Sequence, residues 1–403
     1  MKKEPISILR LENGKYDGVK AIAVTKDGQL MISRSAKTLR KSLSTKTIHA
    51  EKSSSEYLSG PIKVYFDPTL VCPLECSFCL ACAPEHRNST RKIPHLSKDE
   101  VLKIAKQIID SGALQVKIGG GEPFLYEHFF SLVKILSKNS IAVSTSTNGI
   151  TLSNLSQKEI GVLQKNHVKV SISIDGDEEY HNRIRDPKGK FDSIFKNAIN
   201  GLEYLLSNNC CTAIRSTIIN SPESVKQIKF LNQLSQRYEV ETRIRLAKPM
   251  YKANSNSYSF TKPNDLYLEA FKELREIRES NPLINIDDIV NYDDSSNFFN
   301  CGLDCSAGTR SCFVNASGEL SPCGFLDDKF PPISLLDGKT TLKHEWNNGE
   351  SFKNIRRYFK KENEISPCSK CRFVDMCQGG CPAVRFFTQE EQDLRCPLRF
   401  PDV

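Results

Sequence analysis

Fifteen cysteines in 403 residues constrain the fold of this chain more than any other feature of its sequence. Four of them lie between Cys72 and Cys82, and nine lie between Cys301 and Cys396. In a small secreted protein such a number indicates disulfides, but no apolar export segment follows the first charged residues. Grouped cysteines in a reducing compartment are typically metal ligands. The sequence therefore predicts metal sites in two parts of the chain and a cytoplasmic location.

Composition and charge exclude several classes of partner. Hydrophobic residues make up 39% of the chain and charged residues 26%, which is typical of a globular protein. No stretch approaches the roughly 20 apolar residues that are needed to span a bilayer. The formal net charge of +8 is spread along the chain and forms no basic block. We therefore expect neither a nucleic-acid partner nor a membrane.

The first 60 residues predict a small extension. Segments 21–24 and 30–33 flank a polar turn at residues 26–28, which indicates a β-hairpin. A polar run follows it. We expect residues 1–60 to decorate the next domain, with a peptide-docking module as the alternative.

Short strands alternate with helices from residue 61 onward. The helix at 97–111, for example, begins with a Ser-Lys-Asp-Glu capping box and continues with apolar residues at helical spacing. This alternation predicts parallel βαβ units, whose ligands bind at the strand ends. The cysteine-rich end has few apolar runs and needs metal to fold. The predicted parts are an extension at 1–60, an α/β barrel domain at 61–262, a helical linker at 263–296 and a cysteine-rich domain at 297–403.

The first cysteine group is spaced as an iron–sulfur ligand set. Cys72, Cys76 and Cys79 form a CxxxCxΦC pattern, where Φ is an aromatic residue. Three thiolates on one loop can hold three irons of a 4Fe-4S cluster and leave the fourth iron open to another ligand. A zinc ion is the alternative, and it would need a fourth ligand from Cys82 or His86.

A glycine-rich turn follows the next predicted strand. The strand at 115–118 runs into Gly-Gly-Glu-Pro at 120–123. Together with the preceding cysteine pattern, this arrangement resembles the radical S-adenosylmethionine (SAM) superfamily. The resemblance implies a partial (β/α)6 TIM-like barrel and a 4Fe-4S cluster at the first three cysteines, whose electron cleaves SAM to a 5′-deoxyadenosyl radical. It also implies SAM contacts from Phe78, Gly120, Gly121, Glu122, Pro123, Asn148, Ser173, Asp175 and Arg215.

The C-terminal cysteines show a second, longer pattern. Twelve residues separate Cys305 from Gly318, four more precede Cys323, and a CX2CX5CX3CX14C run ends the series. This spacing resembles the SPASM domain, a small irregular domain that usually holds two auxiliary 4Fe-4S clusters. The resemblance implies three 4Fe-4S clusters in all, and zinc fingers are the alternative. It assigns Cys368, Cys371, Cys377 and Cys396 to one auxiliary cluster, and Cys305, Cys323 and Cys381 to the other, with an eighth ligand from Cys312, which we favour, or Cys301.

The two resemblances together imply an enzyme that acts on peptides. SPASM-bearing radical SAM enzymes most often mature ribosomally made peptides, and their auxiliary clusters can take an electron back from the substrate radical. We therefore predict a peptide maturase that forms an oxidative crosslink. Its partners would be a peptide or protein substrate and a reductase, flavodoxin or ferredoxin as electron donor.

Other reactions stay open at this point. A peptide epimerase would need a cysteine as hydrogen donor, for which Cys82 and Cys301 are the candidates. A sulfatase maturase is disfavoured, because Gly324 stands where that family places a catalytic Asp after the equivalent of Cys323. The remaining alternatives are a small-molecule oxidase that acts on an alcohol or a tetrapyrrole, and a non-catalytic iron–sulfur scaffold.

Overall fold

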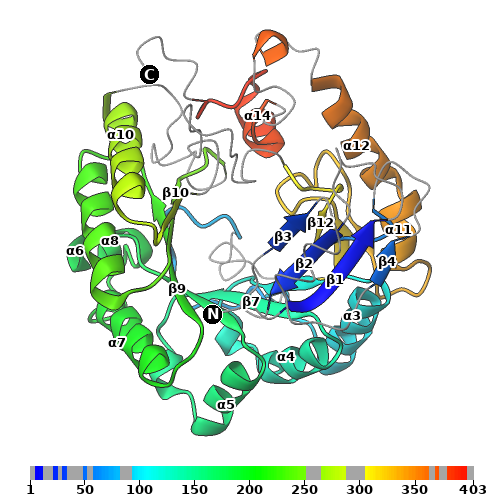
Figure 1. Cartoon of the computed structure of the whole chain (residues 1–403), viewed down its shortest axis with the longest axis horizontal. Coiled ribbons are helices and arrows are strands. Elements are labelled where there is room, and N and C mark those ends of the chain that lie inside the picture. Colours follow the sequence, from blue (N-terminus) through cyan, green and yellow to red (C-terminus); the bar gives the residue numbers. More distant parts are fainter. Residues whose placement is uncertain are drawn as a thin grey trace.

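Two β-sheets and their flanking helices make up the described part of the chain (Figure 1). In this part, no helix has both the length and the apolar character that crossing a membrane requires. The computed structural model describes residues 58–81, 93–250, 265–286, 305–362, 368–371 and 379–396, together with four strands between residues 5 and 51.

The larger sheet has ten strands in the order β11-β10-β9-β8-β7-β6-β5-β12-β13-β14. Neighbouring strands from β5 to β11 are all parallel, because a helix returns the chain after each strand. The sheet is open, with β11 at one edge and β14 at the other. The parallel strands are β5 (Lys63–Phe66), β6 (Gln115–Ile118), β7 (Ala142–Thr147), β8 (Lys169–Ser173), β9 (Thr212–Ile218), β10 (Thr242–Leu246) and β11 (Ile284–Ile286).

Helices line the outer side of this curved sheet (Figure 1). The first of them begins as predicted, since Ser97 and Glu100 form a capping box and Ile104 and Ile108 are buried against the sheet. Six strand–helix units, from β5 to β10, confirm the expected partial (β/α)6 barrel. The helices are α3 (Lys98–Asp110), α4 (Phe129–Lys138), α5 (Gln157–Lys165), α6 (Glu178–Arg185), α7 (Ile194–Ser207), α8 (Ser224–Tyr238) and α10 (Asp265–Ser280).

The two faces of the sheet differ in polarity. Val64 and Val116 pair in register and are fully buried on the helix side, whereas their neighbours Tyr65 and Lys117 pair on the opposite, inner face. When a parallel sheet is covered on both faces, its strands have continuously apolar sequences. The alternation seen here therefore leaves the inner face available for a polar ligand.

One segment differs from the sequence-based expectation, and another goes beyond it. Residues 263–296 were expected to form a helical linker, but α10 packs on α8 and β11 pairs with β10, so both elements belong to the partial barrel. The N-terminal hairpin is present, and it belongs to a four-stranded sheet in the order β3-β2-β1-β4. Those strands are β1 (Pro5–Leu11), β2 (Ala21–Thr25), β3 (Leu30–Ser33) and β4 (His49–Glu51).

The C-terminal segment continues the barrel sheet. Strand β12 lies parallel to β5, with Cys312 opposite Val64, and β13 and β14 extend the sheet further. The Trp346 ring is fully buried, and its indole N–H donates to the carbonyl oxygen of Leu58 at 2.6 Å. The elements are β12 (Ser311–Val314), β13 (Glu319–Ser321), β14 (Ile333–Ser334), α11 (Leu342–Asn348), α12 (Glu350–Glu362), η4 (Cys368–Lys370) and α14 (Pro382–Thr388).

Candidate active site

Three cysteines lie on the loop that follows β5. Cys72, Cys76 and Cys79 are each half-buried, and the amide of Cys79 donates to the carbonyl oxygen of Cys76 at 3.2 Å. Burial above all, opposed by Arg185 and helped by the neighbouring Cys79 and Cys72, raises the pKa of the Cys76 thiol to about 12. Such thiols ionise only when a bound cation compensates their charge. The loop therefore fits a metal cluster.

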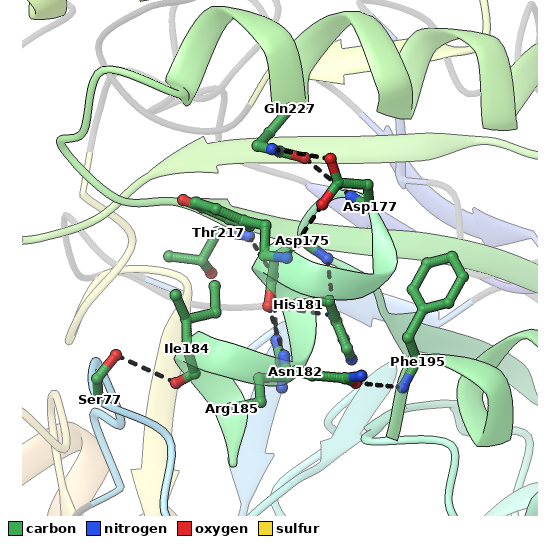
Figure 2. Close-up of polar contacts among 11 residues, drawn as sticks. Ser77, Asp175, Asp177, His181, Asn182, Ile184, Arg185, Phe195, Thr217 and Gln227 are labelled. Atoms are coloured by element: carbon green, nitrogen blue, oxygen red, sulfur yellow. Dashed lines mark hydrogen bonds and ion pairs between the residues drawn. The ribbon is translucent and has the colours of Figure 1, made fainter. Parts of the chain in front are cut away.

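Helix α6 and the segment after it hold this loop in place. The amide and the hydroxyl of Ser77 both donate to the carbonyl oxygen of Ile184, at 2.9 and 3.1 Å (Figure 2). Glu75 forms ion pairs with Lys188, at 2.7 Å, and with Lys190. Hydrogen bonds from these two lysines lower the pKa of Glu75 to about 2. The cysteine loop is thus anchored to the protein on two sides.

The glycine-rich turn after β6 packs against the backbone of the same loop. A Cβ atom on Gly120 would lie 2.1 Å from the carbonyl oxygen of Thr69, and one on Gly121 would lie 2.2 Å from that of Val71. Two amides of the turn also donate to these oxygens, at 2.8 and 2.7 Å. The two loops lie so close together that only glycine fits at positions 120 and 121. This requirement is separate from any close contact with SAM.

The carboxylate of this turn is buried and fully engaged. Glu122 accepts hydrogen bonds from the Thr147 hydroxyl at 2.7 Å, the Asn148 amide at 2.8 Å and the Phe124 amide at 3.2 Å. Burial raises its pKa to about 7 in spite of these donors. The Asn148 side-chain oxygen accepts from Ile150, but its Nδ2 is buried without a hydrogen-bond partner among the described residues. Asn148 therefore offers a donor to a ligand at the end of β7.

A buried charge network follows the end of β8 (Figure 2). Asp175 accepts from Arg185 Nε at 2.5 Å, from Arg185 Nη2 at 3.1 Å and from the Thr217 amide at 2.9 Å. The Asp175 amide donates to His181 Nδ1 at 3.2 Å. Both carboxylate oxygens are thus occupied by protein groups, and the expected contact of Asp175 with SAM remains a prediction.

Sequence reasoning missed the two partners on α6. Arg185 lies over the Phe78 ring, 5.3 Å from its centroid, and so connects the strand end to the cysteine loop. His181 and Arg185 are four residues apart and lie on one face of the helix. The sequence did contain a signal for them, because His181 and Arg185 follow at helical spacing after Asp177, which caps the helix.

Two other predicted SAM contacts lie side by side. Ser173 pairs with Arg215 across β8 and β9, and Arg215 pairs with Arg243 across β9 and β10. All three residues are half-buried on the inner face. The buried Asn148 and Asp175 come just after the neighbouring strands β7 and β8. The structure thus gathers the predicted contacts at one end of the sheet.

Three C-terminal cysteines share a second apolar cluster. Cys305, Cys323 and Cys381 interact electrostatically, and burial raises the pKa of the Cys323 thiol to about 12. Cys312 is not among them: it lies on β12 in the main hydrophobic core, on the helix side of the sheet. The structure therefore does not support the choice of Cys312 as the eighth ligand. The cluster also contains Leu80, Met250, Leu326, Phe330, Ile355, Ala383 and Val384.

Three further predicted ligands, Cys368, Cys371 and Cys396, are among the described residues. Cys368 and Cys371 lie on the turn at η4, where the Cys371 amide donates to the Cys368 carbonyl oxygen at 2.9 Å. Asp393 accepts from the Cys381 amide at 2.9 Å, and its carbonyl oxygen accepts from the Cys396 amide at 3.0 Å. Cys82, Cys301 and Cys377 lie outside the described residues.

Comparison with known families assigns the chain. The model of the radical SAM superfamily matches residues 67–220, and the SPASM model, an iron–sulfur cluster-binding domain, matches residues 305–372. The chain is a radical SAM enzyme with a SPASM domain. The resident groups of this enzyme class are SAM and iron–sulfur clusters. The loop thiols, the orphaned Asn148 donor and the second thiol group of this radical SAM enzyme fit them.

Characterised radical SAM proteins resemble the chain over most of its length. The mycofactocin maturase MftC of Mycolicibacterium smegmatis is 28% identical over 346 residues, which cover 82% of this chain and 80% of the relative. The cysteine-type anaerobic sulfatase-maturating enzyme of Clostridium perfringens is 25% identical over 350 residues, covering 80% and 89%. The fold matches that of Streptococcus suis SuiB bound to precursor peptide SuiA, with a TM-score of 0.67, 16% identity, and coverage of 98% and 99%.

Burial of His181 predicts a pH-dependent stability of the radical SAM domain. Burial lowers its pKa to about 3, and Arg185 acts in the same direction. The unfolded chain takes up a proton near pH 6.5 and the folded chain does not, so stability falls as the pH falls below 6.5. Between pH 7.5 and pH 5.5, His181 should lower the free energy of unfolding by about 1.4 kcal/mol. Urea denaturation at both pH values measures the loss.

The variant His181→Asn keeps an acceptor for the Asp175 amide but has no titratable group. Its unfolding free energy should lose that part of the pH dependence. The control His167→Asn changes an exposed histidine and should keep the wild-type slope. If His181→Asn also keeps that slope, His181 is protonated in the folded protein and the prediction is wrong.

Proposed function

We propose that this radical SAM enzyme matures a ribosomally made peptide by an oxidative crosslink. The relatives support a peptide substrate, since two of them are maturing enzymes by name and SuiB has been solved with its precursor peptide. The observation that carries the oxidative reaction is the second cysteine site. Leu80, one residue after the first cysteine triplet, packs in the same apolar cluster as Cys305, Cys323 and Cys381. The two sites are therefore neighbours.

The residues of the barrel divide into three tasks in this proposal. Cys72, Cys76 and Cys79 would hold the first cluster, and the turn at 120–123, Asn148, Ser173 and Arg215 would bind SAM. When SAM is bound and reduced, its cleavage supplies a 5′-deoxyadenosyl radical that abstracts hydrogen from the substrate. The polar inner face of the sheet keeps the substrate at the carboxyl ends of the strands.

The C-terminal thiols would hold two auxiliary clusters, so that the chain carries three clusters in all. A one-electron acceptor beside the barrel gives the substrate radical a route to an oxidised product. Cys305, Cys323 and Cys381 supply three ligands, and a fourth position is left to Cys301 or to an exogenous group. A flavodoxin, a ferredoxin or a reductase is the proposed source of the first electron.

Sulfatase maturation is not favoured by the structure. Gly324 packs against Phe313, and a Cβ atom on it would lie 2.6 Å from that ring. An aspartate at this position would have to displace a partly buried aromatic side chain. The epimerase alternative depends on Cys82 or Cys301, and it would be redox-neutral overall.

Anaerobic reconstitution tests the proposal. The loaded protein should contain about twelve irons, four for each cluster, and should release 5′-deoxyadenosine from SAM after reduction with dithionite. The control variant, with Cys72, Cys76 and Cys79 all replaced by alanine, should keep about eight irons and release none. Zinc in place of the C-terminal iron, or no deoxyadenosine from a fully loaded wild-type protein, would overturn the proposal.

A further inference from the structure

We propose that Lys248 is a positioning residue that sets the reduction potential of the auxiliary cluster at Cys305, Cys323 and Cys381. This inference rests on the proposed function, since it requires iron at that site. Lys248 comes from the radical SAM barrel and not from the SPASM domain. No sequence motif pointed to it.

The backbone on both sides of Lys248 is fixed. Lys248 lies just after β10, where the Ala247 amide donates to the Ile218 carbonyl oxygen at 2.8 Å. The Met250 amide donates back to the Lys248 carbonyl oxygen at 2.8 Å, which closes a tight turn. Ala247 and Met250 are both buried. The lysine stem therefore leaves the barrel from a rigid point.

The ammonium group contacts one of the three sulfurs. Lys248 Nζ lies 3.6 Å from Cys381 Sγ, within hydrogen-bond distance of a thiol or thiolate. Burial raises the pKa of the Cys305 and Cys323 thiols, and Lys248 acts on both in the opposite direction. One cation thus interacts with all three sulfurs.

The surroundings strengthen this charge. The three sulfurs lie among buried apolar side chains that include Leu326 and Val384, so the local dielectric constant is low. Lys329 and Arg385, two other cations of the region, lie over the ring of Tyr358. The ammonium of Lys248, by contrast, has a hydrogen-bond contact with the sulfur of Cys381.

Lys248 also lies between the two cysteine sites. Ala247 belongs to the apolar cluster that contains Phe78 and Cys76 of the first site, whereas Met250 belongs to the cluster that contains Cys305 of the second. A charge at this point belongs to the rigid barrel. The contact between Lys248 and Cys381 therefore depends on how the SPASM domain packs against the barrel.

The sign of the effect follows from charge balance. Reduction adds one electron to the cluster and makes its total charge more negative by one. A nearby ammonium stabilises the reduced form and raises the reduction potential. In Lys248→Met, the ratio of reduced to oxidised auxiliary cluster at a fixed potential should fall about tenfold, which corresponds to about 59 mV for a one-electron couple.

The experiment is an EPR-monitored dithionite titration of the full, cluster-loaded chain. Iron is counted first in the wild type, Lys248→Met, Lys248→Arg and Lys329→Met. Lys248→Met should keep its iron and titrate at a lower potential, and Lys248→Arg should restore the wild-type value. Lys329→Met removes an exposed cation that faces a ring and should titrate like the wild type.

Two results overturn the inference. If Lys248→Met keeps full iron and the wild-type potential, Lys248 does not tune the cluster. If it loses iron from the SPASM domain, its role is structural. A wild-type protein without auxiliary iron would instead refute the proposed function at the iron count, before any potential is measured.

Discussion

Replacing Arg185 by methionine is expected to lower the free energy of unfolding by about 3–5 kcal/mol, because it leaves a charge unpaired in the interior. Asp175 is fully buried, and Arg185 donates to both of its carboxylate oxygens. Methionine fills much of the same space but donates no hydrogen bond. Since Arg185 also lies over Phe78, the cysteine loop should lose a contact, and the loaded variant should hold less iron.

Arg183 on the same helix provides the matched control. Its side chain is 50% exposed and pairs with Glu223, and exposed pairs contribute about 0–1 kcal/mol. Urea denaturation followed by circular dichroism should show a small loss for Arg183→Met and a large one for Arg185→Met. Adding Asp175→Asn to Arg185→Met removes the orphaned charge and should recover part of the stability. A double variant as unstable as Arg185→Met alone would contradict the buried-charge explanation.

Replacing Gly120 by alanine is the second change with a large expected effect. Gly120 has φ +107°, and a Cβ atom would lie 2.1 Å from the carbonyl oxygen of Thr69. The backbone conformation costs an alanine about 1–2 kcal/mol, and the overlap adds about 1–3 kcal/mol because backbone cannot easily move. We expect a total loss of about 2–5 kcal/mol in the free energy of unfolding.

Gly112→Ala separates the two contributions. Gly112 has φ +79°, but a Cβ atom there would meet nothing within 4 Å. It should lose only the conformational cost of about 1–2 kcal/mol. Equal losses for both variants in urea denaturation would show that the turn and the cysteine loop separate without penalty. That result would contradict the close packing of the two loops.

The sequence predicted those parts of the fold that depend on local pattern. The alternation of strands and helices, the capping box at Ser97 and the polar strand ends follow from periodicity and short motifs, and the barrel confirmed them. The cysteine and glycine motifs were recognisable because their chemistry depends on fixed spacing. They are the reason that the family was visible before the structure.

Contacts between distant segments could not be predicted in the same way. The choice of Cys312 as a ligand relied on the resemblance of the Cys305–Cys312 segment to sulfatase maturases, but strand pairing with β5 turns Cys312 toward the core. Lys248 reaches Cys381 only after the whole barrel has folded. The helix of the expected linker at 263–296 was predicted, but its packing on α8 and the pairing of the three-residue strand β11 with β10 are contacts between distant segments.

The parallel pairing of β5 with β12 also affects how the chain is made. Strand β5 is among the earliest parts of the barrel to leave the ribosome, whereas β12 follows only after all six strand–helix units. Until then one side of β5 has unpaired amide and carbonyl groups, which promote association with other chains. This nascent edge is therefore a point at which the chain can associate with others during synthesis. An expression clone that stops before Ser311 would retain the same exposed edge permanently and would be prone to aggregate.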